Sequence, residues 1–142
     1  MTSSVEIITA IEKGYVEERP DDNWIGIKIT TNKQEIKVLI NDFQSCCEQY
    51  DVVIISPNCT LPIPDIIGYE INNVGWGKEI VNNLTCQIGS LNFYNETLQE
   101  SAIVNIETNK GLYQIIAYND HNGYYPHSVC VEWAEYSDTQ YI

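Results

Sequence analysis

The sequence predicts a mainly β protein: an antiparallel sheet of about six to eight strands built from hairpins, with at most one or two short helices. An α+β arrangement is the alternative. Three observations lead to this fold class: two hairpin patterns, several β-branched segments bounded by turn residues, and prolines at 57, 62 and 64 that exclude a long helix there. At 142 residues we expect one domain spanning 1–142.

The first hairpin pattern runs from Ile25 to Ile40. Isoleucines at 25, 27 and 29 alternate with smaller or polar residues, Thr31–Gln34 supplies turn chemistry, and the alternation resumes through Ile36 and Ile40. This pattern predicts two paired strands with one buried face.

The second hairpin pattern runs from Ala102 to Tyr118. Its turn, Thr108–Gly111, contains Asn and Gly, which tolerate the positive φ of tight turns. The two turns share the residues Thr-Asn-Lys, so a duplicated unit is one interpretation. Hairpin turns also converge on such residues for local reasons, which leaves that interpretation open.

Four further segments are rich in β-branched or aromatic residues and are bounded by Gly, Pro, Asn or Asp. The predicted strands are Val5–Ile11, Tyr50–Ser56, Ile66–Val74 and Ser128–Trp133. An acidic turn is predicted over 17–23, and short helices fit best at 77–83 and 96–101.

Twenty acidic and seven basic side chains give a formal net charge of −13. This charge excludes a general basic grip on nucleic-acid phosphate or on an anionic membrane, so we expect no direct nucleic-acid or membrane partner. A field of this sign attracts basic protein surfaces. The plainer interpretation is that the acidity keeps a small protein soluble.

A cytoplasmic location is expected. The longest apolar stretch, Val52–Ile55, is too short to span a bilayer, and the first residues lack the basic and apolar regions of a signal peptide. Five irregularly spaced cysteines favour reduced thiols over a disulfide framework.

No pattern indicates catalysis or a cofactor. The two histidines, His121 and His127, lie in one turn-rich segment, and no metal-ligating spacing or phosphate-binding loop is present. We therefore expect a binding protein and no enzyme, no cofactor and no metal.

Aromatic residues are frequent in apparent loops and edges, where a flat ring offers a stacking face. They are Trp24, Trp76, Phe93, Tyr94, Tyr124 and Tyr125. Core or edge packing in a β protein is the alternative role for each of them.

Several stretches together follow the order of one family. They are Asp42–Glu48, Asp65–Gly68, and Lys110–Tyr113 leading to Asn122–Tyr125 with Ser128, Val129 and Glu132. In these stretches the chain resembles small proteins of phages and their hosts, a family that includes the Thoeris anti-defence sponges. The resemblance covers about two-thirds of the chain, between positions 42 and 132.

The resemblance implies a β-sheet protomer that forms dimers or larger homo-oligomers and captures a cyclic ADP-ribose signalling molecule without degrading it. The sponges hold the ligand's pyrophosphate with arginines, whereas this chain has a single one, Arg19. The expected ligand-binding residues here are Trp76, Phe93, Tyr94, Lys110, Asn122, Tyr124 and Tyr125. The alternative hypothesis is an acidic protein that mimics nucleic acid and covers the basic site of a host defence or nucleic-acid-binding protein.

Overall fold

The computed structural model describes residues 5–20, 23–42, 49–55, 66–78, 87–88, 91–92, 101–120 and 128–142, with the side chains at 49–50, 87–88, 91–92, 120 and 141 excepted. Within these residues every regular element is a β-strand. The strands are β1 (Glu6–Glu18), β2 (Asn23–Thr31), β3 (Glu35–Asn41), β4 (Gln49–Ile55), β5 (Glu70–Gly77), β6 (Gln87–Ile88), β7 (Leu91–Asn92), β8 (Ser101–Thr108), β9 (Gly111–Asp120), β10 (Ser128–Trp133) and β11 (Tyr136–Tyr141).

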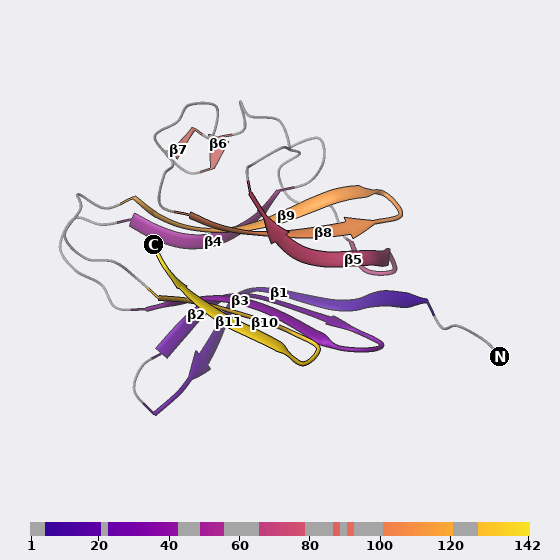
Figure 1. Ribbon diagram of the computed structural model, residues 1–142, viewed down its shortest axis with the longest axis horizontal. Helices are drawn as coiled ribbons and strands as arrows, with labels where there is room; N and C mark the ends of the chain where they lie inside the picture. Colours follow the sequence, from indigo (N-terminus) through magenta and orange to yellow (C-terminus); the bar gives the residue numbers. More distant parts are fainter. Residues whose placement is uncertain are drawn as a thin grey trace.

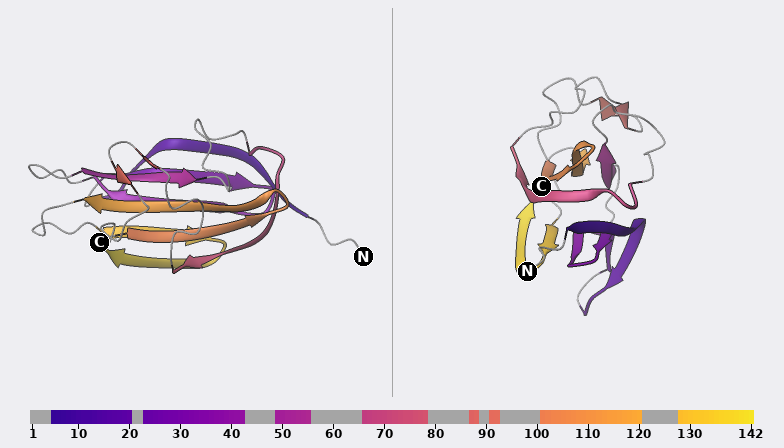
Figure 2. Two further views of the ribbon diagram at one scale, coloured as in Figure 1. Left: turned by 90° about the horizontal axis from the view of Figure 1, so that it is seen from above. Right: turned by 90° about the vertical axis from the view of Figure 1, so that its right-hand side faces the viewer.

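Nine strands form one antiparallel sheet in the order β11-β10-β3-β2-β1-β5-β8-β9-β4, and β6 pairs with β7 separately. The sheet folds over on itself at the β1–β5 pair. Figure 1 shows the result as two layers, with β5, β8, β9 and β4 above β1, β2, β3, β10 and β11. In Figure 2 the long strands of both layers run along the long axis of the molecule.

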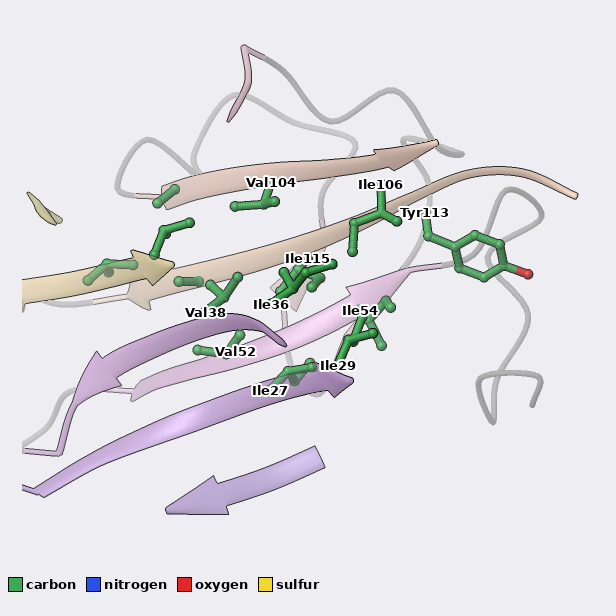
Figure 3. Packing of buried hydrophobic residues seen from close by; sticks show 14 of the residues in the cluster. Ile27, Ile29, Ile36, Val38, Val52, Ile54, Val104, Ile106, Tyr113 and Ile115 are labelled. Carbon is green, nitrogen blue, oxygen red and sulfur yellow. The ribbon is translucent and has the colours of Figure 1, made fainter. Parts of the chain in front are cut away.

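The core lies between the two layers and consists mainly of isoleucine and valine. Alternate residues point inward along each strand, so that Ile27 and Ile29 of β2 meet Val52 and Ile54 of β4 across the interface (Figure 3). Burying each such side chain stabilises the fold by about 1.5–3 kcal/mol. Period-two alternation in the sequence therefore becomes a two-layer core.

The prediction of a mainly β fold is confirmed, and so are both hairpins, as β2–β3 and β8–β9. The predicted number of strands, six to eight, is too low because the sheet alone has nine. The missed strand β11 has no apolar alternation, and each side chain described in it, from Tyr136 to Gln140, is exposed.

The predicted acidic turn over 17–23 is wrong at its start. Strand β1 continues to Glu18 because it pairs with β2 along a long hairpin, in which Glu17 lies opposite Trp24. The predicted strand from Ile66 begins only at Glu70, after a turn. Gly77 and Ser101, at the ends of the predicted helices, lie in strands, and most of both helices falls outside the described residues.

Candidate functional site

An aromatic cluster formed by Trp76, Trp133 and Tyr136 lies where β5 of one layer faces the β10–β11 hairpin of the other. The rings of Trp133 and Tyr136 are stacked, with centroids 4.4 Å apart and an interplanar angle of 23°. Trp76 meets Trp133 edge-on at 6.2 Å, and its Nε1 donates a hydrogen bond of 2.6 Å to Tyr136 Oη. Tyr136 Oη in turn donates to Asp138 Oδ2 at 3.2 Å.

The β10–β11 turn explains this stack. Trp133 pairs directly with Tyr136 across the turn, so both side chains stand on the same face of the hairpin. Ala134 within the turn has a φ of 49°, the left-handed conformation that closes the two-residue connection. Both tryptophans are half-buried against the core, whereas Tyr136 is 39% exposed. The cluster closes one side of the sandwich and presents one aromatic ring to solvent.

The expected ligand-binding residues fall in different places. Trp76 belongs to the aromatic cluster. Lys110 is exposed in the β8–β9 turn, where its backbone N–H donates to Thr108 Oγ1 at 3.1 Å. Since Trp76 lies opposite Val104, six residues before Lys110, the two are about 20 Å apart along β8. The structure does not bring them together.

The other expected ligand-binding residues lie outside the described part of the chain. They are Phe93, Tyr94, Asn122, Tyr124 and Tyr125, and the same holds for His121 and His127.

A charged network covers the outer face of the lower layer, and sequence reasoning missed it. Tyr15, Glu17 and Arg19 follow one another at alternate positions along β1 and just beyond it, and all three are half-buried. Lys37 of β3 and Glu132 of β10 are a cross-strand pair on the same face. We call Tyr15, Glu17, Arg19, Lys37 and Glu132 the outer-face network.

Glu17 is the centre of this network. It accepts hydrogen bonds from Lys37 Nζ at 2.7 Å, Arg19 Nε at 2.7 Å and Tyr15 Oη at 3.0 Å. These bonds, with that from Lys37 the strongest, lower the pKa of Glu17 from 4.5 to about 2 against the opposing effect of burial. The hydrogen bond to Glu17 likewise raises the pKa of Lys37. Glu17 therefore stays ionised well below neutral pH.

Arg19 joins β1 to β10 across the face. Its guanidinium pairs with Glu132 Oε2 at 3.2 Å and lies 5.4 Å from the centre of the Trp24 ring. Cys130 lies beneath it, and burial together with Glu132 raises the pKa of the Cys130 thiol. A buried thiol with a raised pKa is a poor nucleophile. The arrangement holds strands together and shows no assembled acid, base and nucleophile.

A depression of about 660 Å³ adjoins the network between the β2–β3 and β10–β11 turns. Its lining contains two lysines and three glutamates, so its formal charge is negative. The lining residues are Lys33, Gln34, Glu35, Lys37, Glu132, Ala134 and Glu135. This composition suits basic groups of a ligand or partner better than a bare dianion.

The charge pattern explains why the sequence did not reveal this face. Among the described residues, three basic side chains form ion pairs: Arg19 with Glu17 and Glu132, Lys28 with Glu35 at 3.2 Å, and Lys37 with Glu17. Apart from the local pair of Arg19 with Glu17, the partners come from different strands. Only the strand order and register, which a charge count does not contain, bring them together.

Residues 5–131 match the family model described as a domain of unknown function, DUF7448. The chain belongs to this family. No curated protein and no solved structure matches the chain. The match includes most of the outer-face network. It ends before Trp133 and Tyr136, so the exposed part of the aromatic cluster lies outside the matched region.

Two further findings concern the described part of the chain. It contains no group of three His, Cys, Asp or Glu side chains that could hold a metal ion. No helix in it is long and apolar enough to cross a membrane.

Proposed function

We propose that this protein works by binding and not by catalysis, as a phage counter-defence protein in the host cytoplasm. It sequesters a nucleotide-derived immune signalling molecule of the cyclic ADP-ribose type and releases it unchanged. The resemblance of Lys110–Tyr113 and the segments around it to the Thoeris anti-defence sponges supports this class of ligand. The same resemblance supports a homo-oligomer, which light scattering at two protein concentrations would test.

The observation that carries the proposal is the aromatic cluster. Tyr136 is 39% exposed while its ring is held by the stack on Trp133 and by the hydrogen bond from Trp76. A ring that is fixed before binding offers a stacking face at little cost in conformational entropy. Stacking on such a ring contributes about 1–3 kcal/mol per base.

The turn of the same hairpin also borders the depression, which lies on the opposite face of the hairpin from Trp133 and Tyr136. Ala134 and Glu135, which connect Trp133 to Tyr136, also line the depression that contains Lys33. Lys33 is exposed and forms no ion pair within the described residues, in contrast to Lys37. A ligand at the hairpin would stack its base on Tyr136, and Lys33 is the unpaired cation on the far side of the turn.

Calorimetric titration with cyclic ADP-ribose isomers and cyclic dinucleotides tests this function, with the recovered ligand checked by mass spectrometry. We expect binding, intact recovery, and a loss of about 1–3 kcal/mol of affinity for Tyr136→Ala. Tyr136→Phe is the matched control, because it keeps the ring and should retain most of the affinity. The absence of binding to every ligand, or the recovery of a cleaved product, would contradict the proposal.

A second candidate function is supported by the depression and the net charge of −13. Glu35, Glu132 and Glu135 outnumber the two lysines in the lining of the depression. Such a surface fits Lys and Arg side chains, so the protein would cover the basic site of a host defence or nucleic-acid-binding protein. Pull-down from host lysate at low and high salt separates the two functions, because exposed charges are screened within about 10 Å at 0.1 M salt and stacking is not.

A further inference from the structure

The strand order of the sheet is the same when read outward from its centre in either direction. From β1 the neighbours are β2, β3 and β10, and from β5 they are β8, β9 and β4. Each half thus has a first strand, a hairpin and a fourth strand. In each half the fourth strand comes from the other half of the chain, since β4 follows β3 and β10 follows β9 (Figure 1).

The two hairpins pair their strands in the same register. Thr31 and Thr108 are 77 positions apart, and the same spacing relates the pair Ile29–Ile36 to Ile106–Tyr113 and the pair Ile27–Val38 to Val104–Ile115. The spacing also preserves burial. The residues at 27, 29, 31, 36, 38 and 40 are buried, and so are their counterparts at 104, 106, 108, 113, 115 and 117.

The turns repeat a specific set of contacts. The amide Oδ1 of Asn32 accepts the N–H of Ile7 in β1, and Asn109 Oδ1 accepts the N–H of Glu70 in β5, at 2.7 and 3.0 Å. The backbone N–H groups of the two asparagines donate back to the carbonyls of the same residues, Ile7 and Glu70. Each turn therefore fixes the start of the first strand of its own half.

The first strands share an irregularity. The β1–β2 register shifts between Ile8 and Ala10, and the β5–β8 register shifts between Ile71 and Asn73, at the same distance from the two asparagine contacts. Local convergence of turn residues explains the shared turn, but it does not explain a shared bulge in a strand far along the chain.

The fourth strands fit the same scheme. Val52 and Ile54 of β4 pair with Ala117 and Ile115. With the spacing of 77 positions, their counterparts in β10 pair with the counterparts in β3: Val129 with Ile40, and Val131 with Val38. The centre of the arrangement is the pair Ile7–Glu70, which joins the two first strands.

We infer that this chain is an internal duplication in which two four-strand repeats, β1–β4 and β5 with β8–β10, exchange their fourth strands, so that each repeat is the binding partner that completes the other. Three strands alone would leave β3 and β9 as open edges with unpaired N–H and C=O groups. The exchanged strand closes each of these edges. This inference does not rest on the proposed function.

The repeats have diverged on their outer faces. Lys37 and Lys28 of the first repeat correspond to Gln114 and Asn105 of the second, and Glu132 corresponds to Ile55. Gln114 and Ile55 are buried, whereas the charged residues remain partly exposed. Among the described residues, the charged outer face therefore belongs to one half of the sheet and not to the other. A partner that binds this face should do so with a stoichiometry of one per chain.

A register-matched graft into the full chain tests the duplication. Residues 27–38 are replaced by a copy of residues 104–115, with Ile36 retained because the corresponding Tyr113 is larger. The matched control carries a copy of residues 103–114 at the same place, which shifts the pattern by one position and puts Asn at position 29 and Gln at position 38 in the core. A second version of the in-register graft keeps Lys28, Glu35 and Lys37 and so preserves the ion pairs of both lysines.

We expect the in-register graft that keeps both lysines to retain a monodisperse elution profile, native-like near-UV circular dichroism and one cooperative thermal transition. The shifted graft should lose all three. If both in-register versions lose the cooperative transition, or if the shifted graft keeps it, the two hairpins are not equivalent and the inference is overturned.

Discussion

The outer faces of the two layers occupy equivalent positions in the strand order, yet they are built from different chemistry. On the lower layer, Lys28 and Lys37 are both less than 20% exposed, and their ion pairs reach other strands. On the upper layer, the corresponding Asn105 and Gln114 hydrogen-bond to each other at 2.9 Å, and Gln114 is completely buried beside apolar Ile55 and Ile116. Equivalent backbone geometry therefore fixes which positions face outward, whereas the side chains decide whether that face is solvated or covered.

The most direct test of this difference between the two outer faces is to exchange one equivalent pair of side chains. Gln114→Lys places an ammonium at a site with no solvent exposure, and we expect a loss of about 3–5 kcal/mol in the free energy of unfolding. Urea denaturation measures this loss.

The reciprocal change, Lys37→Gln, is the control for that exchange. Glu17 keeps its hydrogen bonds from Arg19 and Tyr15, so the loss should be about 1 kcal/mol. Equal losses at the two positions would mean that both outer faces are equally solvated.

This contrast also shows which features the sequence could predict. The alternation of Ile25, Ile27 and Ile29 fixes a strand with one buried face, because a period of two has no other regular solution. The same rule fails for Ile103 and Ile116, which lie outside the main core and are still buried. Local pattern specifies the strand but not what covers its second face.

The candidate site was predictable only in part, for a related reason. Trp76 was expected as a stacking residue from its type, but its partners Trp133 and Tyr136 come from a hairpin 57 and 60 positions later, and β11 has no strand pattern. The ion pair between Arg19 and Glu132 spans 113 positions. Contacts of this range depend on strand order, which a single sequence does not specify.

Two glycines, one in each half, differ in the space available for a side chain. A Cβ at Gly26 would lie 2.0 Å from the carbonyl oxygen of Val38, whereas a Cβ at Gly75 meets no atom within 4 Å. We expect Gly26→Ala to lower the free energy of unfolding by about 1–3 kcal/mol through overpacking. Gly75→Ala should change it by less than about 0.5 kcal/mol, as surface substitutions usually do. Thermal denaturation of both variants measures these changes. Similar shifts in the melting temperature of the two variants would mean that β2 moves away from β3 without loss of stability.

The charged face should also respond to pH in a way that the covered face does not. The pKa of Glu17 is lowered to about 2 in the folded protein from an unfolded value of 4.5. A lowered pKa stabilises the fold fully above pH 4.5, and this contribution is lost as the pH falls from about 5 to 2. Allowing for solvent screening, we expect it to be about 1–2 kcal/mol.

Denaturation of the wild type and of Glu17→Gln between pH 7 and pH 2 measures this contribution. The variant should show a smaller loss of stability over the acidic range, and direct NMR titration should place the Glu17 midpoint well below 4. A midpoint near 4.5 would mean that Lys37 and Arg19 do not hold the carboxylate in solution.

The smallest expected effect tests what the two halves share. Asn32→Ala and Asn109→Ala each remove the side chain that accepts an N–H at the start of β1 or β5, that of Ile7 or Glu70. Each should cost about 1 kcal/mol in unfolding free energy, with the larger value for Asn32, because its Nδ2 also donates to the carbonyl of Val5 at 2.9 Å. The sites lie in different halves and share no partner, so the double variant should lose the sum within about 0.5 kcal/mol. A loss of stability confined to the Asn32 variant would mean that the two turns are alike in shape but not in their contribution to stability. Matched and additive losses would show that the two halves use the same contact to fix the start of β1 and β5.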